Sequence, residues 1–227
     1  MKQTLCKFAI ALAMTLGVAS SASAATIMQF FETGGFNKPF TFVNDGLGNV
    51  DSTTLTATKT VFVTFDPAFC LAVGCGGVTD GVFDLTLNAQ STSLATLGGG
   101  IVSQDFGGTI SFTSGTLNLL TILFSDTISG SNGGTNPVLQ SSQPPDTFSG
   151  TSDVFDPAKL GIPRGLAISF SALTPGLSIF NNSIASGVAD ASGTVNATAP
   201  VPEPGSMLLL GTGLLSLGSA LRRKLAR

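Results

Sequence analysis

Carboxylates are the main candidates for acid–base chemistry in this 227-residue sequence, because it contains no His. The absence of His excludes Ser-His-Asp and Cys-His catalysis, His-ligated metals and an imidazole pH switch. Two pairs of acids could be imagined as the paired carboxylates of a glycoside hydrolase, Asp80 with Asp84 and Asp153 with Asp156. Asp is also common in β-loops for capping, and no nucleophile motif follows a strand. We therefore expect a protein that is not an enzyme, with a carboxylate-only hydrolase as the less favoured alternative.

A second cluster of oxygen-bearing side chains lies in a Gly-rich stretch at residues 44–51. Its candidate calcium ligands are Asp45, Asn49 and Asp51, since hard cations prefer oxygen ligands in such loops. The stretch lacks the bidentate Glu that ends an EF-hand loop. Ordinary Asx turns explain the same residues more simply. We therefore expect no cofactor, and keep a calcium- or polysaccharide-binding module as the alternative function.

Two cysteines, Cys70 and Cys75, remain after the N-terminal segment described below, which contains Cys6. In an exported chain their simplest interpretation is a disulfide that closes a short loop. Two free thiols are the second interpretation. A zinc site would need further Cys or His ligands, and the spacing differs from the Cys-x-x-Cys of redox enzymes.

The C-terminal segment has three parts in a fixed order. An extended linker at 199–206 comes first, then fifteen uncharged residues at 207–221, then a basic tail at 222–227. The uncharged part predicts a marginal transmembrane helix, and the basic part a cytoplasmic stop-transfer signal. The residues that carry the order are Val201, Pro202, Glu203 and Pro204 in the linker, and Arg222, Arg223 and Lys224 in the tail.

This order resembles the PEP-CTERM sorting signal of Gram-negative bacteria. The resemblance covers only about the last 27 residues of the chain. It implies that the protein is a substrate of exosortase, a membrane-embedded Cys transpeptidase that acts near the Pro-Glu-Pro motif. Glu203 and its flanking prolines would then be a recognition site and not a catalytic one. The implied destination is the cell surface or the exopolysaccharide matrix, after an intermediate in the inner membrane.

The N-terminal segment 1–24 has the three parts of a secretory signal peptide. Lys2 and Lys7 precede an apolar run at residues 8–18, and a small-residue site ends at Ala24. Cleavage is expected between Ala24 and Ala25. The apolar run is short for a helix that spans a membrane, which favours removal of the segment.

The remaining body, residues 25–198, predicts an all-β domain. Short apolar runs alternate with polar residues and are bounded by Gly, Pro, Asn or Asp, which is typical of β-strands in sandwiches. We expect a jelly-roll-like antiparallel β-sandwich with a loop-rich stretch at 129–158 and no long helix. The predicted strands lie at residues 61–65, 82–87, 109–113, 117–125, 165–173 and 187–198.

Aromatic residues and charge narrow the function of this body. Sixteen of the 17 Phe lie in it, and we expect them to form its core. The absence of Trp and Tyr weighs against an aromatic platform for sugars. Residues 25–200 contain twelve acidic and four basic residues, which argues against nucleic-acid binding. We therefore expect a structural or adhesive surface domain, with exopolysaccharide as a candidate partner.

Overall fold

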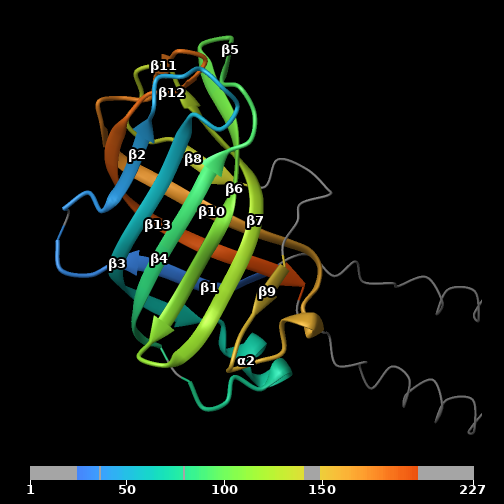
Figure 1. Cartoon of the computed structure of the whole chain (residues 1–227). Coiled ribbons are helices and arrows are strands. Elements are labelled where there is room, and N and C mark those ends of the chain that lie inside the picture. The colour runs from blue at the N-terminus through green and yellow to red at the C-terminus, as the bar shows by residue number, and fades with distance from the viewer. Residues whose placement is uncertain (1–24, 36, 79, 141–148, 199–227) are drawn as a thin grey trace, which may run out of the picture.

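The computed structural model describes residues 25–35, 37–78, 80–140 and 149–198 (Figure 1). Within these residues the chain forms β-strands, one short α-helix and one 3-10 helix. The elements are β1 Ala25–Glu32, β2 Phe40–Asn44, β3 Thr53–Phe65, α2 Pro67–Val73, β4 Gly81–Ser91, β5 Thr96–Gly98, β6 Ile101–Ser114, β7 Leu117–Ser131, β8 Val138–Gln140, β9 Ser149–Thr151, η1 Pro157–Lys159, β10 Gly161–Thr174, β11 Ile179–Phe180, β12 Ser183–Ile184 and β13 Gly187–Thr198.

Eight antiparallel strands close into a β-barrel, so the prediction of a jelly-roll-like sandwich is wrong. The ring runs β6-β4-β3-β1-β13-β10-β8-β7 and returns to β6. The short strand β8 completes it, because Leu139 pairs with Ile128 of β7 on one side and with Ile168 of β10 on the other. Strand β2 pairs with both β3 and β13, next to the segments of those strands that pair with β1.

Alternation along the strands divides the barrel into an inner and an outer face. In β7, Leu120, Ile122 and Phe124 are buried, while Leu123 and Ser125, on either side of Phe124, are exposed. All six predicted strands are present; five of them extend beyond the predicted range, and β13 has the predicted bounds. A sandwich and a barrel share this alternation, so the pattern alone did not distinguish them.

Phenylalanine fills much of the interior, as the sequence predicted. Phe30 of β1 meets Phe112 of β6 with ring centroids 5.1 Å apart. Phe170 of β10 contacts both Phe40 and Phe42, at centroid distances of 5.8 and 5.4 Å. These contacts join strands that are distant in sequence, and they occupy the space inside the ring.

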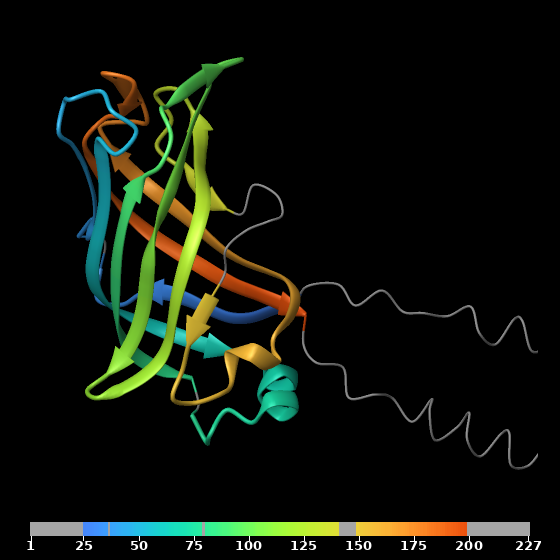
Figure 2. The same cartoon turned by 45° about the vertical axis from the view of Figure 1, so that its right-hand side comes forward.

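One end of the barrel, here called the basal end, carries α2 and η1 (Figure 2). The sequence prediction missed α2, although its signals are conventional. Asp66 caps the helix by accepting a hydrogen bond from the Phe69 N–H at 2.9 Å, Pro67 occupies the first turn, and Gly74 ends the helix at φ 76°. Phe69 packs edge-on against Phe155, so the helix covers the basal end of the core.

The opposite end, here called the crown, consists of three segments, 43–52, 92–101 and 175–186, which include the end of β2 and the first residue of β6 (Figure 1). It includes β5 and the β11–β12 hairpin. Gln104 fixes this hairpin to the barrel: its Nε2 donates to Ser183 Oγ at 2.7 Å, and its Oε1 accepts from the Ile184 N–H at 2.8 Å. Because Gln104 is fully buried, these bonds make the crown a defined surface.

The two termini of the barrel lie together at the basal end. Ala25 pairs with Ala197, and the Asp66 N–H at the start of α2 donates to the Ile27 carbonyl at 3.0 Å. The stretch predicted to be loop-rich, 129–158, contains the end of β7, all of β8 and β9, and the start of η1. Among the described residues, no helix is long and apolar enough to cross a membrane.

Candidate functional site

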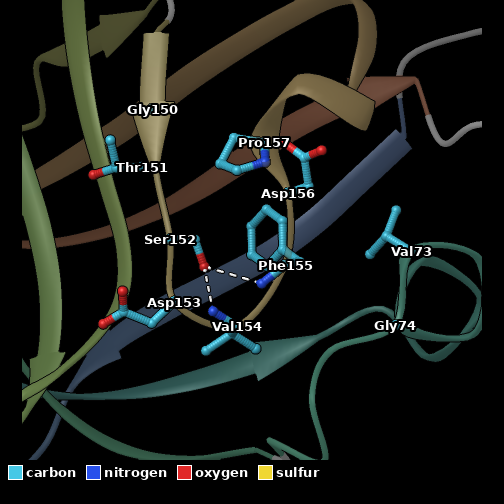
Figure 3. A pocket seen from close by; sticks show the side chains of 10 residues that line it. All are labelled: Val73, Gly74, Gly150, Thr151, Ser152, Asp153, Val154, Phe155, Asp156 and Pro157. Carbon is cyan, nitrogen blue, oxygen red and sulfur yellow. Dashed lines mark hydrogen bonds between the residues drawn. The ribbon is translucent and has the colours of Figure 1, made fainter.

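A shallow groove at the basal end lies between the end of α2 and the segment that joins β9 to η1 (Figure 3). Its volume is about 630 Å³. Ser152 organises one wall: its Oγ donates to the Leu119 carbonyl at 2.6 Å and accepts from the N–H groups of Val154 and Phe155. The hydroxyl is therefore engaged in shaping the turn.

The carboxylates beside this groove also accept local hydrogen bonds. Asp153 Oδ2 accepts from the Asn118 N–H at 2.8 Å, and Asp156 Oδ1 accepts from the Ala158 N–H at 3.0 Å at the start of η1. The other imagined pair behaves similarly. Asp80 Oδ1 accepts from the Phe65 N–H, and Asp84 Oδ1 accepts from Thr60 Oγ1. Each of these acids thus contributes to a turn, a cap or a pair of strands.

The calcium-ligand candidates lie in the crown loop that follows β2. Asp45 Oδ1 accepts from the Leu47 N–H at 2.9 Å, which is an Asx turn. The Asn49 N–H donates to Ser52 Oγ at 2.8 Å, and the Asp51 carbonyl accepts from Gln90 Nε2 at 2.9 Å. Across the described parts of the chain, no three His, Cys, Asp or Glu side chains are grouped to hold a metal ion.

Cys70 and Cys75 form a disulfide with a Cα–Cα distance of 4.9 Å. Cys70 lies in α2, and Cys75 follows the helix and is buried. The bond fixes the end of the helix against the chain that leaves it. Together with the contact between Phe69 and Phe155, it holds α2 over the basal end.

The sequence prediction missed a pair of acids in the barrel wall, Glu32 and Asp190. Glu32 Oε1 accepts from the Ala191 N–H at 2.6 Å, and Asp190 Oδ1 accepts from the Lys38 N–H at 2.7 Å. These bonds hold the loop between β1 and β2 to β13. The pKa of the Glu32 carboxyl lies above its usual value, mainly because the group is buried. The nearby charge of Asp190 also raises this pKa, whereas the hydrogen bond from the Ala191 N–H and the charge of Lys59 act in the opposite direction. Glu32 is the only Glu of the barrel, but nothing near it in sequence indicates burial.

The predicted sorting elements lie outside the described residues. These are Ala24, the motif from Val201 to Pro204, the transmembrane helix at 207–221 and the basic cluster from Arg222 to Lys224. Ala25, on the other side of the predicted cleavage site, is the first residue of β1. Signal removal at this bond would leave the whole strand intact.

Comparison with family models finds the PEP-CTERM protein-sorting motif at residues 200–224. The segment predicted from the order of its parts is confirmed. The chain thus carries the tail of an exported protein that exosortase recognises and that is sorted by way of the membrane to the cell surface. Comparisons with curated proteins and with solved structures find no match.

Proposed function

We propose that the barrel serves at the cell surface or in the exopolysaccharide matrix as a structural and adhesive domain without enzymatic activity. The observation that carries this proposal is which end of the barrel is joined to the sorting motif. The last strand, β13, ends at the basal end, and the sorting motif follows it from residue 200. An attachment made through the motif therefore holds the barrel by its basal end and leaves the crown available for contacts.

The interior of the barrel supports the same proposal. Buried apolar side chains from the strands of the ring meet across it, as the contact between Phe30 and Phe112 illustrates. The polar groups of the basal groove already satisfy backbone donors, as Ser152 and Asp153 do. Such an arrangement favours a role in which the outer surface makes the contacts.

The sorting step can be tested by replacing Pro202, Glu203 and Pro204 with Ala in a host that carries exosortase. We expect the full-length chain to accumulate in the membrane fraction and surface exposure to fall. The matched control, Leu123→Ser, changes an exposed residue of β7 and keeps the motif intact. Unchanged processing and display of the Ala variant would contradict recognition through this motif.

The adhesive role needs a separate measurement. A deletion strain should attach less and retain less matrix, and the wild-type chain should restore both. The Ala variant of the motif should not restore them. Deletion without any effect on attachment or matrix mass would overturn the adhesive role. Release of reducing ends from isolated matrix polysaccharide by the purified protein would overturn its non-enzymatic character.

A further inference from the structure

The crown concentrates exposed apolar side chains. The described residues expose twelve large apolar side chains, and seven of them lie in the crown. Leu47 is 70% exposed, and Leu97 and Phe180 are each 57% exposed. Val43, Val50, Leu94 and Ile101 complete the set. Because single exposed apolar residues are normal whereas clusters are not, this concentration marks an interaction surface.

Hydrogen bonds between the crown loops fix this surface in place. Asn44 Nδ2 donates to the Phe180 carbonyl at 2.9 Å, and Asn181 Nδ2 donates to the Gly46 carbonyl at 2.9 Å. The Ala95 N–H donates to the Asn182 carbonyl at 2.8 Å. The three loops therefore hold one another, and a partner would meet a surface that is already ordered. Binding to such a surface avoids much of the entropic cost of ordering loops.

Charge and size restrict the partner. The crown loops contain Asp45 and Asp51 and no Lys or Arg, so they lack the cations that attract nucleic acid, anionic lipid or an acidic polysaccharide. The seven exposed apolar side chains lie on segments that are hydrogen-bonded to one another, and together they expose on the order of several hundred Å². Stable interfaces bury about 800 Å² on each partner. The combined exposed area of the seven side chains thus approaches one side of a modest protein interface.

Strand β5 provides an edge for a partner of the same kind. It pairs with residues Ile101 to Ser103 of β6, and among the described residues no strand pairs with it on its other side. Its residues, Thr96, Leu97 and Gly98, include none of the Lys or Pro that commonly protect an edge strand. Two copies of an antiparallel edge can align about a two-fold axis, because such an interface uses the same patch on both subunits.

We propose that a second copy of this chain packs against the crown, so that two barrels associate crown to crown. The basal ends then point away from each other, and the pair connects two separately attached barrels. This arrangement adds a partner to the adhesive role proposed above. Only the cellular effect of the dimer rests on that role, because association of the barrels is measured in solution without cells.

Residues 25–198 are suited to this test, because the buried core and the pairings that close the barrel lie within them. Sedimentation velocity from micromolar to several hundred micromolar protein should show a monomer–dimer equilibrium. We expect Leu47→Ser and Leu97→Ser each to weaken the dimer at least tenfold. Leu123→Ser is the matched control: Leu123 is 52% exposed on the outer wall and should not affect association. Equal melting temperatures will show that all the variants fold.

Added salt and lipid vesicles distinguish this geometry from others. Facing crowns bring Asp45 and Asp51 of both copies together, so salt should strengthen the dimer by screening like charges. The proposal is overturned if the wild-type barrel stays monomeric at all concentrations. It is also overturned if the crown variants leave the dimer intact or if salt weakens the dimer. If the monomer instead binds phosphatidylcholine vesicles and Leu47→Ser abolishes that binding, lipid occupies the crown and the proposal is also overturned.

Discussion

Gly108 in β6 provides a direct test of the barrel's packing, because another strand passes very close to it. A Cβ atom at Gly108 would lie 2.3 Å from the Asn88 carbonyl oxygen and 2.4 Å from Ala89 Cα. Both belong to the backbone of β4, which pairs with β6. A backbone cannot yield as a side chain can, so Gly108→Ala must push two wall strands apart.

The expected cost follows from known packing energies. Overpacking costs about 1–3 kcal/mol, and a contact with backbone belongs at the upper end of this range. Replacing Gly also reduces the entropy of the unfolded chain, which returns roughly 0.5 kcal/mol. We therefore expect Gly108→Ala to lower the free energy of unfolding by about 2–2.5 kcal/mol. For a domain of this size, such a loss lowers the melting temperature by roughly 4–10 °C.

Gly98→Ala is the matched control, since a Cβ at Gly98 meets nothing within 4 Å. It should leave stability unchanged or raise it slightly. Urea unfolding followed by circular dichroism measures both variants in the barrel of residues 25–198. If Gly108→Ala and Gly98→Ala agree within about 0.5 kcal/mol, the close approach of β4 and β6 does not exist as described.

Three further predictions concern other parts of the barrel. Replacing Cys70 and Cys75 together with Ala should lower the free energy of unfolding by about 2 kcal/mol, the value for so short a loop, and reduction of the wild type should have a similar effect. Glu32→Gln should raise the free energy of unfolding at pH 7, and this gain should shrink as the pH falls toward 4. The reason is that the raised pKa makes the folded state favour neutral Glu32, so the wild type loses stability as the carboxyl ionises. Urea unfolding at several pH values tests this, and a gain that grows toward low pH would contradict it. Gln104→Leu should lower the free energy of unfolding by about 3 kcal/mol, because it leaves buried groups of the crown hairpin without their hydrogen bonds. Faster hydrogen exchange of the Ile184 amide would show that the effect lies in this hairpin.

The sequence predicted the strands of this fold better than their arrangement. Alternation in stretches such as 82–87 and 109–113 depends on burial of one face, and β4 and β6 have that property. Closure depends instead on β8, three residues within a stretch that appeared loop-rich. Pairings between distant segments have no local signal, so the choice between barrel and sandwich could not come from alternation.

The candidate sites show the same limit. The sorting tail could be predicted because its information is the order of residues along the chain. Glu32 and Asp190 could not be predicted as neighbours, since 158 positions separate them and only the adjacent pairings of β1 and β2 with β13 bring them together. The crown is a further example, because its apolar residues are scattered over three loops.

The division between a linear address and a folded body also determines how the two proposals can fail. Sorting depends on residues 200–224, whereas association depends on side chains of the barrel such as Leu47 and Leu97. A crown variant should therefore reach the surface normally and lose its partner. A motif variant should keep its solution dimer and lose its destination. If a crown variant also changed processing of the tail, the two parts would not be independent, and the barrel itself would contribute to recognition by exosortase.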